Sequence, residues 1–411
     1  DVMGIVGNGV SHTTLKQAGI ETADLLIAVT GSDEENLLCC AIAKKSGHCQ
    51  TIARIRNPIY NEEKDFLQKE FGLSMIINPE LTAANEIAKV FQFPSAIRVD
   101  TFAKGRVELL HFKIGSNSPL CGLKLSKFHA TLHCNDILVC TIARNSEEVI
   151  IPNGDFEFAA NDIVSIVAKR RDAIDFFRKI GLEKNRVSNT IIAGGGKISY
   201  YLAKSLLMSG IKTTIIEINQ QRCEFLSEQL PKATILCGDA TDKELLSEEC
   251  IEKAAGFAAL TDLDEENILL SLYVNGISSA KTVTKVNRIN FTSVINKLDL
   301  GSIIYPRVIT AEYIIKYVRS MNNSLNSNVE ALYKLEDGKA EVLEFLLKEN
   351  SAVCNIPLQN LKIRKNTLIC CIYRNHQVIV PSGQDCMMPG DSVMIATSGY
   401  NISDIKEILE D

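Results

Sequence analysis

Long basic runs and long apolar runs are both absent from this 411-residue sequence. Its formal net charge is −6, so neither a nucleic-acid footprint nor a patch for anionic membranes is evident. The longest apolar segments, such as residues 24–30, are of strand length and far shorter than the roughly 20 residues that span a bilayer. Asp1–Gly9 lacks the basic region and sustained apolar stretch of a secretory leader. We therefore expect a soluble protein that binds no nucleic acid and serves any membrane from outside.

The spacing C-x-x-C is also absent, although the chain has 13 cysteines. Their odd number and their position in apolar segments predict buried thiols in a reducing cytoplasm. An apolar fraction of 46% is ample for several hydrophobic cores. With a nominal domain of about 150 residues, the length predicts two to four domains.

What the sequence does contain is an internal repeat. Residues 23–38 resemble residues 254–270, with Thr30 and Thr261 separated by 231 positions and the motif Asp-Glu-Glu-Asn in both segments. Further on, residues 149–155 resemble residues 378–385. The repeat of about 230 residues is far longer than the roughly 20–50 residues of a solenoid repeat. It therefore indicates a tandem duplication of a two-domain unit, in which an α/β domain is followed by a small β-rich domain.

The second α/β domain has the sequence order of a phosphate-binding fold. The apolar run 189–193 leads into Gly194-Gly195-Gly196, and a helical pattern follows from Lys197. Glu217 ends the next predicted strand, 21 residues after Gly196, where the dinucleotide-binding fingerprint places an acid for a ribose. Gly194 would allow the tight reversal, and Gly196 would let backbone N–H groups approach a pyrophosphate at the positive end of the helix dipole.

Further strands are expected at 234–237, 257–260 and 281–286, and a helix near Asp264. This alternation predicts a Rossmann-like, doubly wound parallel sheet. Ser199 stands where the fingerprint has its third glycine, and we expect it to loosen the packing of strand and helix. A glycine motif alone is weak, so a packing turn without ligand remains the alternative.

The first α/β domain differs at its start. Residues 1–6 correspond to the third strand of the second domain, and the turn at Gly7 corresponds to the turn at Gly238. The segment that would carry strand, glycine turn, helix and acid is missing from this sequence, so either the sequence is a fragment of a longer chain or another molecule completes the domain. We therefore expect any nucleotide there to be held only by the remaining half of the site.

Several motifs together resemble the RCK (KTN) domains that regulate potassium transport. They are A-L-T-x-x-D-E-x-N at 259–267, G-D-A-T-D at 238–242, the glycine turn, and I-x-P-x-G-D at 150–155. The resemblance implies an RCK-N and an RCK-C domain, each occurring twice. We place the four domains, the first of them incomplete, at residues 1–96, 97–184, 185–322 and 323–411.

The resemblance also implies a function. RCK proteins of this kind sense NAD(H) and ATP or ADP without turning them over, and form homo-oligomeric rings. Such a ring would lie in the cytoplasm, on the inner face of the cell membrane, beneath a TrkH-type or TrkG-type potassium pore. The expected function is therefore a regulatory subunit of a Trk-type potassium uptake system.

Carried over by position, the resemblance assigns ligand-binding residues in both copies. In the second α/β domain they are Gly194, Gly195, Gly196, Lys197, Ile198 and Ser199 at the phosphates, Glu217 at the ribose, Asp239 and Ala240 at the adenine, and Thr261 and Asp262 near the central phosphates. In the first α/β domain they are Asn8, Gly9, Thr30 and Gly31, with Arg54 and Arg56 at terminal phosphates. Lys285 and Asn287 correspond to that arginine pair and keep one positive charge, so the two copies are expected to be unequal sensors.

Other interpretations compete with these. Arg54 and Arg56 lie on one face of a strand and could form a solvated edge. Asp33 and Asp264 could suggest metal or acid–base chemistry, but first-turn acids complement the helix dipole, and Ser32-x-x-Glu35 fits a capping box. His129 and His133 have helical spacing beside Cys134, yet no fourth metal ligand is evident, so we predict no metal site.

The two classes of competing function are an NAD-dependent oxidoreductase and a pure assembly scaffold. Against the oxidoreductase, no histidine or lysine suited to proton relay stands beside a substrate domain, so we expect no enzymatic activity. A scaffold would show no response to nucleotide. Turn motifs at residues 151–155 and 380–383 are typical of hairpins. Helices expected at 82–91 and 310–318 carry apolar residues at helical spacing, and the resemblance places them at a dimer contact.

Overall fold

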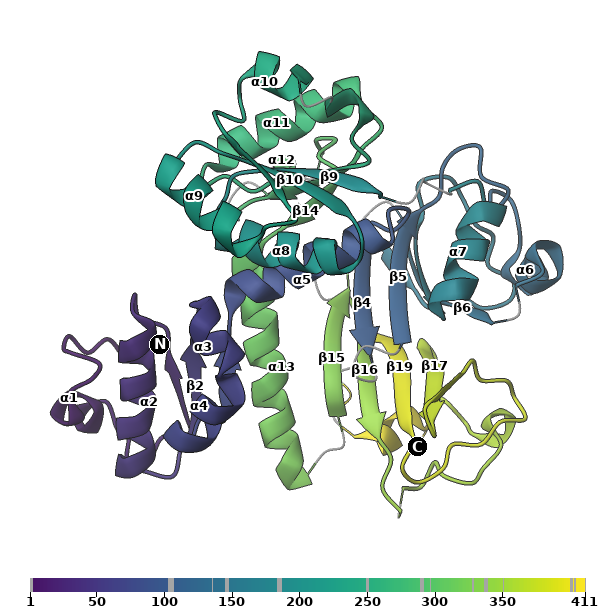
Figure 1. The fold of residues 1–411 in the computed structure, drawn as a ribbon. Helices are drawn as coiled ribbons and strands as arrows, with labels where there is room; N and C mark the ends of the chain where they lie inside the picture. The colour runs from purple at the N-terminus through teal and green to yellow at the C-terminus, as the bar shows by residue number, and fades with distance from the viewer. Residues whose placement is uncertain are drawn as a thin grey trace. The chain divides into compact units, whose positions relative to one another are not determined.

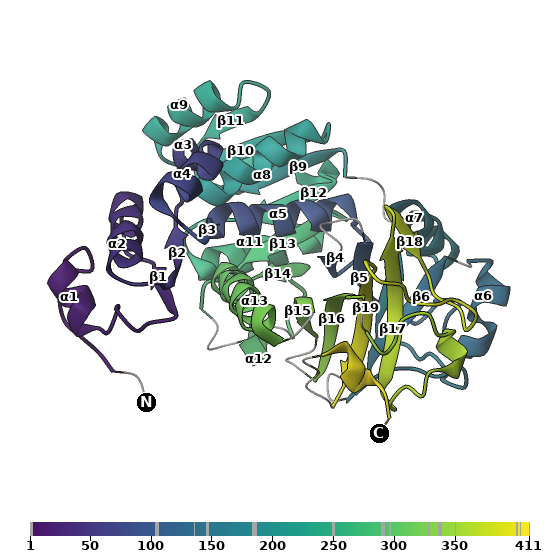
Figure 2. The same ribbon diagram turned by 90° about the horizontal axis from the view of Figure 1, so that it is seen from below.

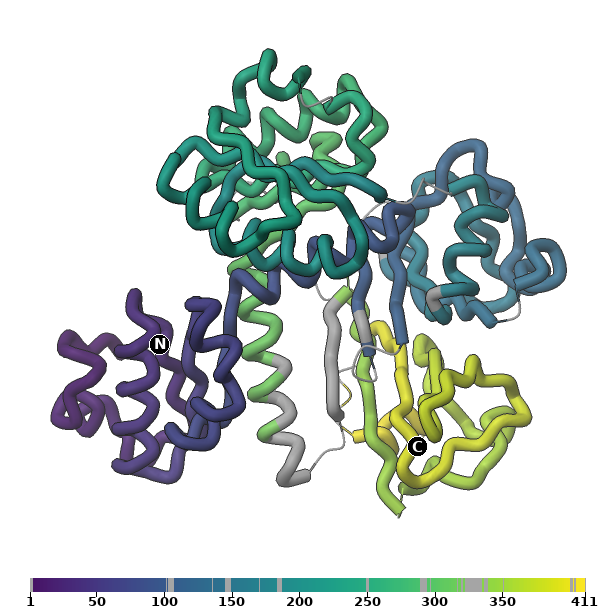
Figure 3. Tube along the Cα trace, in the orientation of Figure 1, coloured from purple at the N-terminus to yellow at the C-terminus, as the bar shows by residue number. Residues whose placement is uncertain are grey.

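The computed structural model describes residues 3–102, 107–134, 136–144, 148–182, 187–248, 251–288, 292–295, 297–326, 329–335, 339–349, 351–399, 402 and 404–410. Figure 3 draws residues whose placement is uncertain in grey. The chain divides into two compact units, one made of residues 1–88 and 189–311, the other of residues 89–188 and 312–411. The two α/β domains therefore share one unit, and the two β-rich domains share the other.

The second α/β domain is a six-stranded parallel sheet in the order β11-β10-β9-β12-β13-β14. Its central strands are continuous apolar runs, as expected for strands buried on both faces. Helices α8 and α9 cover one face and α11 the other (Figures 1 and 2). The predicted doubly wound sheet is thereby confirmed. Its elements are β9(Asn189–Ala193), α8(Lys197–Met208), β10(Lys212–Glu217), α9(Gln220–Gln229), β11(Thr234–Cys237), α10(Lys243–Glu248), β12(Gly256–Ala259), α11(Asp264–Ile277), β13(Lys281–Lys285), α12(Thr292–Ile295), β14(Ser302–Ile304) and α13(Pro306–Asn326).

The first α/β domain has a three-stranded parallel sheet in the order β1-β2-β3, which corresponds to β12-β13-β14. Of the strand expected over residues 1–6, residues 3–6 are exposed and outside any strand, and residues 1 and 2 lie outside the described residues. Its counterpart β11 is held by hydrogen bonds to β10, whereas among the described residues the sheet β1-β2-β3 offers residues 3–6 no such neighbour. The elements are α1(His12–Gln17), β1(Leu25–Ala28), α2(Asp33–Ser46), β2(Gln50–Arg54), α3(Pro58–Glu62), α4(Lys64–Phe71), β3(Met75–Ile77) and α5(Pro79–Gln92).

Helix α5 shows why the expected connecting helix forms. Ala83, Ala84, Ile87 and Phe91 are all buried and recur at the spacing of one helical face. Pro79 occupies the start of the helix, where its missing N–H group costs nothing. Helix α13 begins in the same way at Pro306. Both predicted connecting helices are therefore present.

Each β-rich domain is a five-stranded antiparallel sheet, and the strand orders β4-β5-β8-β6-β7 and β15-β16-β19-β17-β18 match element for element. Figure 2 shows the two sheets within their unit. The first comprises β4(Arg98–Phe102), β5(Val107–Lys113), α6(Leu125–Leu132), β6(Ile137–Arg144), β7(Glu148–Ile150), β8(Ile163–Ala168) and α7(Arg170–Lys179). The second comprises β15(Val329–Leu335), β16(Ala340–Leu346), β17(Thr367–Arg374), β18(Gln377–Ile379) and β19(Ser392–Ser398).

The two β-rich domains also share a hydrophobic core. Val107 and Leu109 from the first sheet pack in one cluster with Val342 and Met394 from the second. Within this core Cys140 and Cys370 occupy equivalent positions, each at a register shift in its strand. The shared core gives both sheets a buried face in addition to the face that each buries within its own domain.

The turn motifs after β7 and β18 form turns, with Asn153 accepting from the amide of Phe156 and Ser382 from that of Asp385. β6 and β7 form one hairpin, and β17 and β18 form the other. The turn motifs come after the second strand of each hairpin and do not connect its two strands. The prediction that the thiols are buried holds for most of the described cysteines and fails for Cys237, which is exposed.

No helix within the described ranges has both the length and the apolar character needed to cross a membrane.

Candidate functional site

The candidate site lies at the carboxyl edge of the second α/β sheet. The strand order changes direction between β9 and β12, and ligands of doubly wound sheets bind outside the strand ends at this switch point. The fold brings the predicted residues to this one edge, because each follows or ends one of four neighbouring parallel strands. They are Gly194 to Ser199 after β9, Glu217 at the end of β10, Asp239 and Ala240 after β11, and Thr261 and Asp262 after β12.

The three glycines of the turn differ in what surrounds them. Gly194 has φ +94°, and a Cβ there would lie 2.9 Å from the backbone nitrogen of Thr261. A Cβ on Gly196 would meet no heavy atom within 4 Å. Gly196 is also the N-cap of α8, and no side chain caps the first turn, which contains Lys197 and Ile198. An open space beside an uncapped helix N-terminus is the arrangement that binds an anion.

Glu217 is fixed by the backbone of this turn. Its Oε2 accepts a hydrogen bond from the amide of Gly195 at 2.6 Å, and its Oε1 accepts one from the amide of Asn219 at 2.8 Å. A carboxylate offers about four lone-pair sites, so two hydrogen bonds leave acceptor capacity for a sugar hydroxyl. The structure therefore places the predicted acid within hydrogen-bond distance of the predicted phosphate turn.

Arg222 also lies at this site, although no sequence motif predicted it. Its Nε donates to the carbonyl of Gly195 at 2.7 Å, and its guanidinium stacks on the Phe225 ring. Burial lowers the pKa of Arg222, while the neighbouring Glu217 opposes that shift. Arg222 lies in the first turns of α9, five residues after Glu217. In the sequence, Arg222 is a single basic residue among neutral and acidic neighbours. Its place at the site becomes clear only from the structure, where α9 begins beside the glycine turn.

Ser199 does the opposite of what was predicted. It is fully buried, and its hydroxyl donates to the carbonyl of Gly194 at 2.5 Å. The side chain therefore fastens the glycine turn to the first turn of α8 instead of loosening their packing. Asp239 is exposed, and hydrogen bonds from Thr241 hold its pKa below the ordinary value.

Asn267 organises the loop after β12, a role that was not predicted from the sequence. Its Oδ1 accepts from the amide of Thr261 at 2.8 Å, and its Nδ2 donates to the carbonyls of Thr261 and Lys285 at 3.0 and 3.1 Å. Asn36 makes the same contacts with Thr30 and Arg54 in the first α/β domain. The repeated asparagine thus joins the ends of two adjacent strands in each copy. Its recurrence in the repeat was the available signal.

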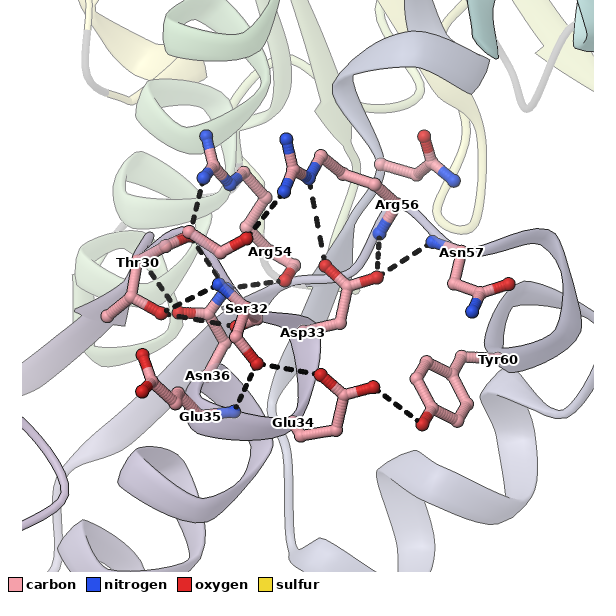
Figure 4. A network of polar contacts seen from close by, with 12 residues as sticks. Thr30, Ser32, Asp33, Glu34, Glu35, Asn36, Arg54, Arg56, Asn57 and Tyr60 are labelled. Carbon is pink, nitrogen blue, oxygen red and sulfur yellow. Dashed lines mark hydrogen bonds and ion pairs between the residues drawn. The ribbon is translucent and has the colours of Figure 1, made fainter. Parts of the chain in front are cut away.

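The acidic residues beside these asparagines lie in the first turns of α2 and α11, as predicted, and two of them have a further contact that was not predicted. Ser32 caps α2 by accepting from the amide of Glu35 at 3.2 Å, which confirms the capping residue. Asp33, however, accepts from the amides of Arg56 and Asn57 at 2.9 and 2.8 Å (Figure 4). It therefore fastens the loop after β2 and does not cap its own helix. Asp264 holds the corresponding loop after β13 in the same way.

The basic pair of the first α/β domain lies against the loop that was predicted to bind nucleotide. Arg56 Nη2 donates to the carbonyl of Gly31 at 2.7 Å, and Arg54 Nη2 donates to the carbonyl of Thr30 (Figure 4). Thr30, Gly31 and both arginines are thus brought together. Asn8 and Gly9 lie before α1, and within the described ranges no hydrogen bond joins them to Thr30 or Gly31; Asn8 Oδ1 accepts from the amide of Val10.

The counterpart of Arg54 in the second copy is directed inward. Lys285 is buried, with its Nζ 3.4 Å from the carbonyl oxygen of Leu260 and 3.5 Å from Oδ1 of Asp262. Burial lowers the pKa of Lys285, and Asp262 partly restores it. Asn287 bonds to Asp264. The two copies therefore differ in exposure at Arg54 and Lys285, and in charge at Arg56 and Asn287.

The histidine pair has local partners. Nδ1 of His129 is 2.8 Å from the carbonyl oxygen of Cys134, and His133 closes α6 in a left-handed conformation with φ 49°. Among the residues that the structure describes, no group of three or more His, Cys, Asp or Glu side chains is arranged to hold a metal ion.

Comparison with known proteins gives the same domain pattern. The TrkA-N domain family matches residues 1–79 and 190–306, and the TrkA-C domain family matches residues 109–181 and 342–410. The GsuK channel shares the fold with a TM-score of 0.62 at 14% identity, over 96% of this chain and 68% of that one. A GsuK channel bound to NAD aligns with a TM-score of 0.60, also at 14% identity, with the same coverage.

Curated relatives match almost the whole chain. The Trk system potassium uptake protein TrkA homolog 1 of Methanosarcina mazei is 31% identical, over 99% of this chain and 90% of the relative. The TrkA homolog of Archaeoglobus fulgidus is 32% identical, over 99% and 90%. The TrkA protein of Halomonas elongata is 30% identical, over 96% and 86%. With both domain types present twice and relatives matched along nearly their full length, the chain belongs to the TrkA family of Trk system potassium uptake proteins.

Proposed function

We propose that this chain is the nucleotide-sensing regulatory subunit of a Trk-type potassium uptake system. The observation that carries the proposal is the glycine turn at the switch point. There the open space at Gly196, the uncapped N-terminus of α8 and the carboxylate of Glu217 stand side by side. A diphosphate fits the first two features, and a ribose hydroxyl fits the third. NAD(H), ATP and ADP all combine these groups, and the GsuK channel bound to NAD has the same fold.

Position by position, the assignment follows the sequence prediction. Gly194 to Ser199 would surround the phosphates, Glu217 the ribose, Asp239 and Ala240 the adenine, and Thr261 and Asp262 the central phosphates. Arg222 joins this set as a cation that lies on the turn itself. Its guanidinium would add a charge-assisted contact to a phosphate without having to move far.

The first α/β domain would sense a different ligand feature. Arg56 is partly exposed and tied to Gly31, whereas its counterpart in the second copy is the neutral Asn287. We propose that Arg54 and Arg56 respond to the terminal phosphate of ATP, while the second copy binds a dinucleotide or ADP through its complete glycine turn. Such a difference needs only the 1–3 kcal/mol that is typical of allosteric coupling.

Binding rather than turnover is the proposed activity. The relatives are named as potassium uptake proteins, and the site offers backbone amides, a carboxylate and the guanidinium group of Arg222. Those groups bind and orient phosphates and sugars. An NAD-dependent oxidoreductase would need a positioned proton donor for its substrate, and no histidine is among the residues gathered at this edge.

The proposed partner is a TrkH-type or TrkG-type membrane pore. The chain would act from the cytoplasm, on the inner face of the membrane, as a homo-oligomer whose shape depends on the bound nucleotide. A nucleotide shifts the pore only if it binds one state of the assembly more tightly than the other.

Calorimetry with NAD, NADH, ATP and ADP on the purified chain tests the proposal. The matched variant is Gly196→Ala, because its added methyl meets no protein atom and occupies the space proposed for the phosphate. We expect binding by the wild-type chain and at least about tenfold weaker binding by the variant, a loss of about 1.4 kcal/mol.

A second measurement tests the link to transport. Potassium uptake would be followed in host cells that retain a Trk-type pore and lack its regulator, with either the wild-type chain or Gly196→Ala supplied. Restored uptake that depends on an intact glycine turn supports the regulatory role. Absence of any nucleotide binding, or equal binding by both proteins, rules out this site as the sensor.

A further inference from the structure

The two α/β domains meet at a buried tyrosine. Tyr201 lies on α8, one turn after Lys197, and only 6% of its surface is exposed. Its hydroxyl donates to the backbone carbonyl of Arg56 at 3.1 Å and accepts from Nδ2 of Asn78 at 3.0 Å. Both partners belong to the first α/β domain, which is in the same compact unit as α8.

Each end of this contact is part of a candidate nucleotide site. On one side, α8 begins at the glycine turn, so a rigid helix joins Tyr201 to the proposed phosphate position. On the other side, Arg56 is attached to its own loop by its guanidinium, which donates to Gly31, and by its amide, which donates to Asp33. Tyr201 therefore links α8 directly to the backbone of Arg56.

The hydroxyl of Tyr201 is well suited to hold this position. Burial raises the pKa of Tyr201 to about 12, so the hydroxyl remains a donor at neutral pH. Its donor and one acceptor site are both used in the structure. Lys204 of α8 also contacts Glu62 of α3, with Nζ 3.2 Å from Oε1, and both of these side chains are exposed. Exposed ion pairs contribute at most about 1 kcal/mol, so the buried tyrosine is the stronger link.

We propose that Tyr201 couples the nucleotide sites of the first and second α/β domains. The inference rests on the proposed nucleotide-binding function and adds how the two unequal sites communicate within one chain. Occupation of the glycine turn shifts α8, and Tyr201 transmits that shift to Arg56 and hence to the loop at Gly31. By linkage, a ligand at Arg54 and Arg56 changes the affinity of the glycine turn by the same factor.

The chain supplies a matched control in the preceding residue. Tyr200 lies on the same helix and is equally buried at 6% exposure. Its ring packs against Phe225 of the second α/β domain. Tyr200→Phe and Tyr201→Phe therefore remove the same atom from adjacent positions, and only the second removes a hydrogen bond to the first α/β domain.

The test is hydrogen exchange of the full chain titrated with ADP and, separately, with NADH. Arg54→Ala is used as the background so that ligand at the first domain is weakened. Amides of residues 194–199 report occupation of the glycine turn, and the amides of Arg56 and Asn57, which both bond to Asp33, report the response of the first domain. A coupling of about 1–3 kcal/mol corresponds to a change in exchange rate of about 5- to 150-fold.

With Tyr201 present, we expect ligand at residues 194–199 to change exchange at Arg56 and Asn57 by at least about fivefold. Tyr201→Phe should reduce that response to less than about twofold, while the ligand concentration for half-protection of residues 194–199 stays within about twofold. Tyr200→Phe should leave both unchanged.

A full response in Tyr201→Phe, or no response at Arg56 in the parent protein despite protection at residues 194–199, overturns the coupling role and leaves nucleotide binding intact. Loss of the response in both tyrosine variants also overturns it, since the helix would then be disturbed generally. If neither ligand protects residues 194–199, the proposed function and the coupling fail together.

Discussion

Gly194 is required at the phosphate turn for two reasons, its backbone conformation and its close approach to β12, and replacement by alanine tests both. The residue has φ +94°, a region in which a side chain costs about 1–2 kcal/mol. The added Cβ would also lie 2.9 Å from the nitrogen of Thr261 and 3.0 Å from the carbonyl oxygen of Leu260. These are backbone atoms at the end of β12, so relief requires the strand ends to separate. Overpacking of this kind costs about 1–3 kcal/mol more.

Gly210 is the matched control. It has φ +75°, and a Cβ there would meet no heavy atom within 4 Å. Gly210→Ala should therefore lose only the conformational part, about 1–2 kcal/mol, whereas Gly194→Ala should lose about 2–5 kcal/mol. Urea unfolding followed by circular dichroism measures both, since the chain has no tryptophan. With a slope of about 1–3 kcal/mol per molar urea, the two midpoints should differ by about 1 M. Equal losses in the two variants would refute the close approach of β12 to the turn.

Three further predictions concern buried polar groups and thiols. Asn267→Ala should lower the free energy of unfolding by at least about 2 kcal/mol in urea, because buried backbone groups lose their partner; unchanged stability would contradict its structural role. Burial alone would raise the pKa of Asp100, but Arg98 and a hydrogen bond with His111 lower it well below the usual range. The ionised carboxylate therefore stabilises the folded state above about pH 4, and this contribution is lost as the pH falls further. Asp100→Asn should therefore cost about 1–3 kcal/mol at pH 7 and flatten the loss of stability between about pH 5 and 2, and an unchanged acid limb would exclude this carboxylate as its source. Burial raises the pKa of Cys140 well above its ordinary value, whereas Cys237 is exposed. Iodoacetamide at about pH 7 should therefore label Cys237 before Cys140, as followed by mass spectrometry. Faster labelling of Cys140 would contradict the buried core.

The fold was predictable from the sequence wherever hydrophobic pattern and glycine chemistry agree. The run 189–193 before three glycines predicts a strand and a turn. The same motif occurs at the start of α2 and of α11, so each copy supports the prediction of a helix in the other. Residues 3–6 of the strand expected at residues 1–6 pair with no strand of the described sheet β1-β2-β3, and an apolar run becomes a strand only where another strand accepts its hydrogen bonds. Local pattern does not report whether that partner exists.

The candidate site was predictable in its backbone and less so in its side chains. Glu217 and the glycine turn follow from spacing along one strand-turn-helix unit. Arg222, Asn267 and Asp33 act through hydrogen bonds to residues that are distant in the chain or on another strand. Their roles depend on how the strand ends are arranged in space, which hydrophobic periodicity does not encode. The inward position of Lys285 was hidden for the same reason.

The core shared by the two β-rich domains has a consequence for how the protein behaves at low abundance. Its residues come from both sheets, yet all belong to one polypeptide. A pairing between separate chains weakens on dilution, whereas a tethered pairing depends on an effective concentration that the cell cannot dilute. The duplicated sheets should thus remain joined at any expression level. Because one chain supplies both sheets, their ratio is fixed at one to one and does not depend on protein concentration.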